Sequence, residues 1–404
     1  MPSPDSADLY QLELLTDSEL ITFTRKQNSQ SWKGRLSADD YVIRETVLGK
    51  SKMISHSTNK LLVFMLKKRG DDTPLSSIEL LIRDGWRFDY VDGKTTQRTV
   101  STGCIGGVFT YPENRGKGYA RIMVDKLVDI AVKEYLGPDG FVFLYSEVGE
   151  YYAKNGFKSF PVDLVNIPLQ NVEAIETEVS ANVSPISYHQ FAPYLMSHNK
   201  QVRRKIAAKV DDDHLSRVTL VPNSDIVDWF HLRSKYISYK MFHEKNDNER
   251  IDFVKESYEQ ITKKFDSLQP NHFGLELKDD SGNLVGYIVW TYDWSNMEEN
   301  YATVLNIYVA DGYDREEKSL VLLKLLRKHL LTNSDNEGQT TTKIVIWESE
   351  VSTSVLNFLT SKWCSKSGLE NGSRSAILIN DPSSQQKLLD GSLIWDYNDK
   401  LSWF

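Results

Sequence analysis

The sequence predicts an α/β protein built from two domains, and three observations support this prediction. The first is length, since 404 residues exceed what one hydrophobic core usually organises. The second is the alternation of apolar strands with amphipathic helices in residues 10–165, which is typical of a mixed sheet covered by helices. The third is a series of hairpin, strand, helix, strand and helix in residues 272–363. A polar, turn-rich segment places the boundary near residue 180, which gives domains 1–180 and 181–404.

The elements of the first half follow from hydrophobic periodicity. Strands are expected at 9–15, 61–66, 75–82, 101–110 and 141–146, and helices at 17–28, 37–48 and from 120 onward. Ser37 and Asp40 form a plausible capping pair for the second helix, and Gly137 ends the third. Residues 85–99 are expected to form a turn-rich excursion between two strands.

The second half has a similar order of elements. Residues 272–292 are expected to form a hairpin about the turn DDSGN. The later strands are expected at 302–310 and 343–349, and the helices at 319–331 and 353–363. The basic run 201–209 is interpreted as the solvated face of a helix rather than a nuclear import signal.

Composition argues against several classes of protein. The net charge of −8 leaves no dominant basic face that could bind nucleic acid. The sequence contains no run of 18 apolar residues, so a membrane-spanning helix is not expected. The N-terminus lacks the pattern of a secretory signal. Only Cys104 and Cys364 are present, which favours a reducing compartment, the cytosol or the nucleus. Neither histidine nor cysteine spacing indicates a metal site, so none is expected.

The segment TYPENRGKGYAR, residues 110–121, joins an apolar strand to a helix. Gly116 and Gly118 allow backbone N–H groups to converge, and the helix dipole favours negative charge at the same point. A polyphosphate is the expected ligand of such a turn. The P-loop and GxGxxG patterns are absent, and the segment instead contains Arg115-x-x-Gly118-x-Ala120, which fits [QR]-x-x-G-x-[GA].

Two further features accompany this loop. Pro112 precedes the arginine, and the strand FVFLYS (141–146) leads to EYYAKNGF (150–157). Together they resemble the GNAT superfamily of acetyl-CoA-dependent N-acetyltransferases over about residues 10–165. The resemblance implies a mixed, splayed central sheet flanked by helices, with acetyl-CoA as co-substrate. An ordinary βαβ unit with a glycine-rich turn is the alternative.

The second half resembles the same fold but lacks its loop. Its corresponding segment, ADGYDREEKS (310–319), holds one glycine and four carboxylates, which would repel a pyrophosphate. This indicates a degenerate GNAT-like α/β domain without the pyrophosphate loop. An unrelated α/β domain is the alternative.

A narrower resemblance, to fungal lysine N-acetyltransferases, begins at SWKGRLSADDYVIRE (31–45). The shared positions are Trp32, Gly34, Leu36, Ser37, Tyr41, Arg44 and Glu45, with Trp229, His231 and Arg233 in the second half. The resemblance implies lysine as acceptor. Core packing is an equally good explanation for Trp32 and Tyr41.

The GNAT resemblance also implies which residues bind the co-substrate. The backbone N–H of Val108 is expected to stabilise the oxyanion of the thioester. Backbone groups of Phe109 and Thr110 are expected to pair with the pantetheine arm. The pyrophosphate is expected on the loop, which comprises Arg115, Gly116, Lys117, Gly118, Tyr119 and Ala120.

Tyr152 matches the tyrosine of the superfamily's FYxxxGF segment and is the expected general acid for the leaving thiolate. A protonated amine must also lose a proton before it attacks, so a carboxylate base is needed. The strand 101–110 contains none, which leaves Glu79 and Glu147 as candidates; a solvated strand-edge role is equally compatible with each. Cys104 has no sequence neighbour that would activate it as a nucleophile.

Three functions follow from these features. The leading one is acetylation of free lysine or a related small amine by direct transfer. The others are a non-catalytic acetyl-CoA-binding sensor and an acetyltransferase that acts on protein amines, with the second domain as a docking surface. The sequence predicts neither a nucleic-acid nor a membrane partner, and it does not indicate an oligomeric state.

Overall fold

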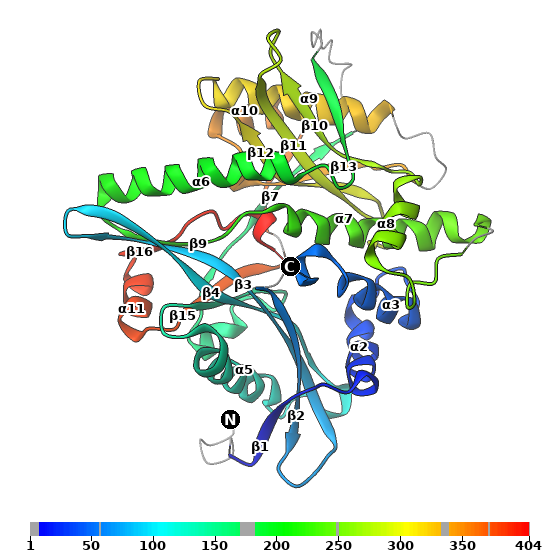
Figure 1. Cartoon of the computed structure of the whole chain (residues 1–404), viewed down its shortest axis with the longest axis vertical. Helices are drawn as coiled ribbons and strands as arrows, with labels where there is room; N and C mark the ends of the chain where they lie inside the picture. The colour runs from blue at the N-terminus through cyan, green and yellow to red at the C-terminus, as the bar shows by residue number, and fades with distance from the viewer. Residues whose placement is uncertain are drawn as a thin grey trace.

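The computed structural model describes residues 8–55, 58–169, 182–247, 250–332, 339–370 and 372–403. Two sheets stack along the long axis of the molecule, and helices α6 (Ala192–Asp213) and α7 (Ser224–Ser238) cross its middle between them (Figure 1). The predicted α/β class is confirmed, because helices flank two mixed sheets.

The first sheet has nine strands in the order β1-β2-β3-β4-β5-β15-β6, with β9 on the outer part of β3 and β16 beside β9. Its strands are β1 (Tyr10–Leu14), β2 (Lys60–Lys68), β3 (Pro74–Val91), β4 (Lys94–Thr110), β5 (Phe141–Ser146), β6 (Lys158–Phe160), β9 (Ser216–Leu220), β15 (Arg374–Ile379) and β16 (Leu393–Trp395). Every neighbouring pair is antiparallel except β4–β5 and β9–β16.

The second sheet has seven strands in the order β14-β7-β13-β12-β11-β10-β8. They are β7 (Asp163–Pro168), β8 (Val183–Ser187), β10 (His272–Lys278), β11 (Leu284–Asp293), β12 (Tyr301–Val309), β13 (Lys343–Trp347) and β14 (Lys366–Glu370). The only parallel pair on this path is β12–β13.

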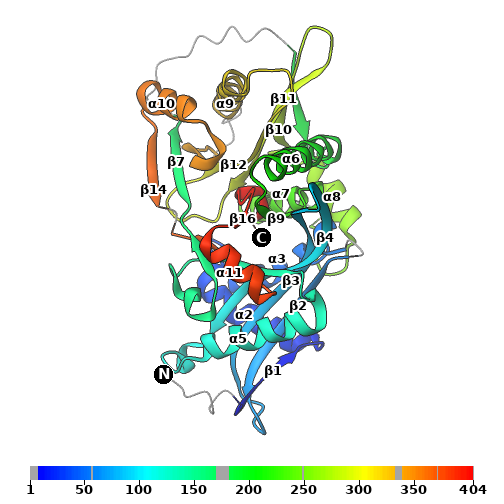
Figure 2. The same cartoon turned by 90° about the vertical axis from the view of Figure 1, so that its left-hand side faces the viewer.

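The helices lie mostly where periodicity predicts them. The remaining helices are α2 (Ser18–Trp32), α3 (Ala38–Leu48), α4 (Lys52–Ser55), α5 (Tyr119–Ile130), α8 (Tyr258–Asp266), α9 (Arg315–Thr332), α10 (Thr353–Lys362) and α11 (Pro382–Asp390). The Ser37 hydroxyl accepts the Asp40 N–H at the start of α3, which confirms the capping prediction. Helix α5 packs its apolar face on the first sheet, and α3 and α7 pack against each other near the opposite face (Figures 1 and 2).

The expectation of a turn-rich excursion at 85–99 was wrong. Strands β3 and β4 instead form one long hairpin that stays paired from Ser76–Thr110 to Val91–Lys94. The chain reverses at Asp92 and Gly93, whose φ angles are 51° and 76°. This left-handed pair suits an Asp-Gly turn between two strands, so the dipeptide was the missed signal.

The two sheets exchange strands. Strand β7, from the first half of the chain, lies between β13 and β14 of the second sheet. Strand β15, from the second half, lies between β5 and β6 of the first sheet. Each sheet therefore contains strands from both halves of the chain, so no single point in the sequence separates the two sheets. The expected domain boundary at residue 180 lies outside the described residues.

Candidate active site

The strands at the centre of the first sheet separate at the candidate site. Strands β4 and β5 pair only from Thr102–Phe141 to Ile105–Leu144. On its other edge, β4 pairs Gly106 with Glu79 and Phe109 with Ser77, so a bulge lies between these pairs. The edge of β4 that faces β5 therefore leaves backbone groups without a strand partner beyond Ile105.

Gly107 occupies the bulge with φ +56°. A Cβ atom there would lie 3.2 Å from Glu79 Cγ and 3.3 Å from Asn28 Nδ2. A side chain would therefore meet both backbone strain and two close neighbours, which explains the glycine.

A cavity of about 280 Å³ opens where the two strands diverge. Its lining residues are Asn28, Trp32, Tyr41, Arg44, Glu45, Leu48, Glu79, Ile105, Gly106, Gly107, Val108, Leu144, Tyr145, Glu147, Val148, Tyr152, Trp229 and Arg233. The four residues expected from the sequence to act in catalysis, Tyr152, Glu79, Glu147 and Val108, all lie on this one cavity. The structure therefore brings the candidates together, while their roles stay predictions.

Glu79 lies on β3 beside the bulge and is only 8% exposed. Burial raises the pKa of its carboxyl from 4.5 to about 7, although the charge of Arg25 opposes the shift. A carboxyl with this pKa exchanges a proton near neutral pH, as a general base requires.

Tyr152 lies in the short helix η3 (Tyr151–Asn155), which ends at the left-handed Gly156. Its ring packs edge-on against Tyr151 and Phe157, and 7% of the residue is exposed. Burial, with the charges of Tyr151 and Glu147, raises the pKa of the phenol, so it keeps its proton at neutral pH. A protonated phenol can donate to a leaving thiolate.

Glu147 follows β5 and is exposed, unlike Glu79. It accepts a hydrogen bond of 3.0 Å from the indole Nε1 of Trp32, at the end of α2. The Trp32 ring also packs edge-on against Phe109, 6.0 Å between centroids. Trp32 therefore both packs and orients a carboxylate of the cavity.

The glycine-rich loop lies between β4 and α5. Gly116 and Gly118 have φ angles of +78° and +80°, and a Cβ atom at Gly116 would meet nothing within 4 Å. The Arg115 Nε donates to the Thr110 carbonyl, while Lys117 Nζ donates to the Glu113 carbonyl. The loop thus presents open backbone at the N-terminus of a 12-residue helix, and these residues fit a pyrophosphate.

Several cavity residues were not among the predicted site residues. Tyr41, Arg44 and Glu45 come from α3, and Trp229 and Arg233 come from α7. All five belong to the segments that resemble lysine N-acetyltransferases, so those patterns were the available signal. His231, between the last two, lies elsewhere: it is buried and its Nε2 is 2.9 Å from the Trp290 carbonyl oxygen.

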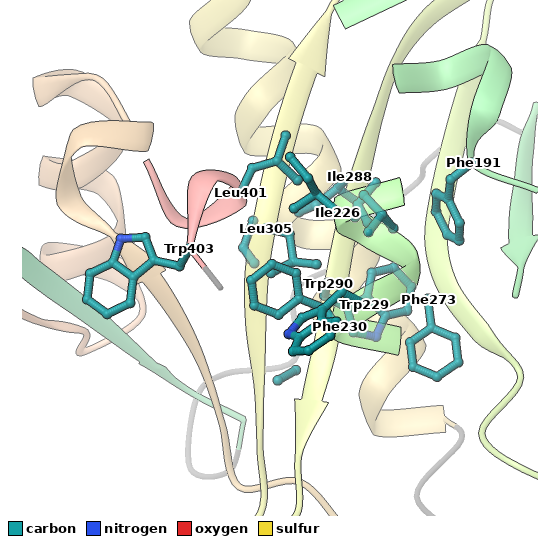
Figure 3. Close-up of a cluster of buried hydrophobic side chains, with 14 of the residues drawn as sticks. Phe191, Ile226, Trp229, Phe230, Phe273, Ile288, Trp290, Leu305, Leu401 and Trp403 are labelled. Atoms are coloured by element: carbon teal, nitrogen blue, oxygen red, sulfur yellow. The ribbon is translucent and has the colours of Figure 1, made fainter. Parts of the chain in front are cut away.

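The second sheet has a similar divergence, but the chain's own C-terminus packs there. Strands β12 and β13 pair only over Tyr301–Thr303, and the helix η7 (Lys400–Ser402) packs against β12. Figure 3 shows Leu401 near Leu305 of β12, within a large buried cluster. Trp403 stacks on Tyr145 at 4.1 Å and lies edge-on to Trp347 at 4.7 Å.

The loop before α9 carries carboxylates that already have partners. Asp311 forms an ion pair with Arg204, and Asp314 accepts the Glu317 N–H at the helix start. This arrangement places negative charge where a pyrophosphate would need N–H donors.

Among the residues that the structure describes, no helix is both long enough and apolar enough to span a membrane. The same residues contain no group of three or more histidine, cysteine or acidic side chains arranged to hold a metal ion.

A family model and a solved structure both indicate which known fold this chain has. A family model for the LYC1 GNAT-like C-terminal domain matches residues 166–404, more than half of the chain. The solved structure of a GCN5-related N-acetyltransferase from Anabaena variabilis aligns with a TM-score of 0.50 at 12% identity, covering 92% of this chain and 73% of that one. The chain therefore has the fold of GNAT-type N-acetyltransferases.

Two curated relatives are similar in sequence. Protein YGR111W of Saccharomyces cerevisiae is 26% identical over 436 aligned positions, covering 97% of each chain. A lysine acetyltransferase of Yarrowia lipolytica is 31% identical over 163 positions, which cover 36% of this chain and 40% of that protein. The chain belongs to the family defined by the LYC1 GNAT-like C-terminal domain.

Proposed function

We propose that this protein is an acetyl-CoA-dependent N-acetyltransferase whose acceptor is the side-chain amine of free lysine or a related small amine. The main support is that Glu79, Tyr152 and the Gly107 bulge lie on one cavity at the divergence of β4 and β5. The partial similarity to a lysine acetyltransferase supports the choice of acceptor.

In this proposal, acetyl-CoA supplies the acetyl group and the chain provides its binding and the proton transfers. The loop from Arg115 to Ala120 binds the pyrophosphate with backbone N–H groups. The free edge of β4 at Phe109 and Thr110 pairs with the pantetheine arm as an added strand would. The Val108 N–H donates to the thioester oxygen as negative charge develops on it.

Two side chains move protons. Glu79 accepts the proton of the ammonium group, directly or through water, and the amine then attacks the thioester carbon. Tyr152 donates its proton to the sulfur as the C–S bond breaks, and its phenolate then takes the second proton that the nitrogen loses on becoming an amide. Glu147, held by Trp32, attracts the cationic amine towards the cavity.

The proposal is tested by incubating the full chain with labelled acetyl-CoA and, in parallel, lysine, spermidine and a mixture of lysine-containing peptides. We expect label on lysine, and Glu79→Gln and Tyr152→Phe variants should each lose most of it. Label on the peptides alone would replace the small acceptor with a protein amine. Tight acetyl-CoA binding without any acetylated amine would indicate a sensor instead.

A further inference from the structure

Helix α7 brings one cation from the second half of the chain into the cavity. Trp229 and Arg233 lie one turn apart on α7 and both line the cavity. The helix is fixed to α3 because Tyr236 donates to the Asp40 carbonyl at 2.8 Å. Lys240, just beyond the end of α7, adds an ion pair, with its Nζ 2.8 Å from Asp40 Oδ1. Figure 1 shows α7 crossing beside α3.

The other charged groups of the cavity either have hydrogen-bond partners or are buried. Arg44 donates from Nε and Nη2 to Glu45 Oε1, at 2.9 Å and 2.5 Å. Glu147 accepts the Trp32 indole N–H. Glu79 is buried beside the bulge, with 8% of the residue exposed.

Arg233 is different. It is partly buried, and no described residue accepts a hydrogen bond from its guanidinium or forms an ion pair with it. Burial, followed by the charge of Arg44, lowers its pKa, and Asp293, Glu45 and Tyr41 only partly offset this. Asp293 itself accepts bonds from the Ser295 N–H and hydroxyl and from the Tyr301 hydroxyl. A half-buried guanidinium that lines the cavity without a protein acceptor is available to an anionic group of a ligand.

We propose that Arg233 binds the carboxylate of the acceptor, so that the acceptor is a free amino acid rather than a simple polyamine or an internal peptide lysine. This inference rests on the proposed function and adds a specificity-determining residue to it. The guanidinium suits this role because its planar donors match a carboxylate with two parallel hydrogen bonds. The acceptor would then lie between a cation that holds its carboxylate and the acidic groups that receive its amine.

The test compares L-lysine with L-lysinamide and 1,5-diaminopentane, which lack the carboxylate. Calorimetry measures their affinity for the full chain saturated with coenzyme A, and steady-state assays measure KM and kcat with acetyl-CoA. The parent should bind lysine about 10- to 100-fold more tightly than lysinamide, the range expected for hydrogen bonds to a charged group. Arg233→Met should remove this preference by weakening lysine binding alone, and Arg233→Lys should retain part of it. Arg204→Met, which removes an exposed arginine of α6, is the matched control and should behave as the parent.

Equal lysine preference in the parent and in Arg233→Met would overturn the inference, as would a parent that binds lysine no better than lysinamide. A loss of affinity for all three amines, with a lowered melting temperature, would assign Arg233 a structural role instead. If Arg233→Met fails to fold, the ratio of lysine to lysinamide affinity is measured in Arg233→Lys instead, and a ratio equal to the parent's would overturn the inference. A lysine preference that depends on Arg233, without acetylation of any amine, would remove the proposed activity but keep the binding role.

Discussion

The indole Nε1 of Trp32 donates a 3.0 Å hydrogen bond to Glu147 Oε2, which joins the end of α2 to the residue that follows β5. These residues are far apart in the sequence, and each lines the same cavity. The contact fixes an exposed carboxylate on the cavity that is proposed to bind the acceptor.

Trp32→Phe should therefore weaken the use of the amine without affecting acetyl-CoA. Phenylalanine keeps an aromatic ring beside Phe109 but removes the N–H donor. A bond of about 1 kcal/mol corresponds to roughly a fivefold fall in kcat/KM for the amine. Glu147→Gln provides the second arm of a double-mutant cycle, and the double variant should cost less than the sum of the single losses. Strictly additive losses would mean that the two residues act separately.

Glu79→Gln should reduce turnover by about 10²- to 10⁴-fold, the usual contribution of a general base. In the parent, kcat/KM for the amine should fall as the pH drops below about 7, because the carboxyl becomes protonated there. A Glu147→Gln variant should keep this pH dependence, which makes it the control. The assignment of Glu79 as base fails if Glu79→Gln retains the parent's rate and pH profile.

The same substitution should stabilise the fold at alkaline pH. Because the folded pKa is raised, the native state binds a proton more readily than the unfolded chain, so the parent loses stability as the pH rises from about 4.5 through about 7. A shift from 4.5 to about 7 corresponds to at most about 3 kcal/mol. Glutamine carries no charge, so the melting temperature of Glu79→Gln should exceed that of the parent at pH 8 and approach it at pH 5.

Tyr152→Phe keeps the buried ring and removes only the hydroxyl. If the phenol protonates the leaving thiolate, kcat should fall about 10²- to 10⁴-fold while the affinity for acetyl-CoA changes little. Tyr151→Phe, on the neighbouring ring, is the control and should retain activity. An unchanged kcat in Tyr152→Phe, with a loss of only about 1 kcal/mol in stability, would make the hydroxyl a packing feature.

Gly118→Glu should abolish acetyl-CoA binding, because a carboxylate would occupy the position proposed for the pyrophosphate. Gly118 has φ +80°, so the substitution also strains the backbone. Gly93→Glu controls for that strain, since Gly93 has φ +76° in the distant β3–β4 turn. Calorimetry should show binding in Gly93→Glu and none in Gly118→Glu; binding of equal strength in both would refute the loop assignment.

The chain should bind one coenzyme A. The second divergence of strands contains Leu401 and Trp403, and the loop before α9 carries the paired Asp311. The two side chains fill the space that the pantetheine arm of a second coenzyme A would need, and the carboxylate would repel its pyrophosphate. A titration that saturates near two equivalents would contradict this expectation, while loss of all binding in Gly118→Glu would support it.

Local patterns predicted the parts of the site that are contiguous in sequence. The loop at Gly116 and Gly118, the helix after it and the Tyr152 segment follow each other along the chain, so periodicity and motif were sufficient. The convergence of Glu79 and Glu147 followed from the resemblance, which supplied the arrangement of the strands. The position of Arg233 on the cavity was not predicted, because it depends on how α7 packs against α3.

The exchanged strands were not predictable in the same way. The sequences of short strands such as Asp163–Pro168 and Arg374–Ile379 do not identify the strands they pair with, because strand pairing depends on contacts distant in sequence. The long β3–β4 hairpin was predictable in principle from Asp92 and Gly93, but neighbouring polar residues suggested a loop.

The exchange also sets the order of events on the ribosome. The first sheet lacks its strand between β5 and β6 until residues 374–379 have been synthesised, so a nascent chain that already contains the candidate active site cannot complete the sheet that frames it. At about 5–20 residues per second, roughly ten seconds or more separate the emergence of β7 from that of β15. During this interval the edge of β5 has no partner strand and remains open to other chains. We therefore expect misassembly to be most frequent before residue 374 is synthesised, while the first sheet is incomplete.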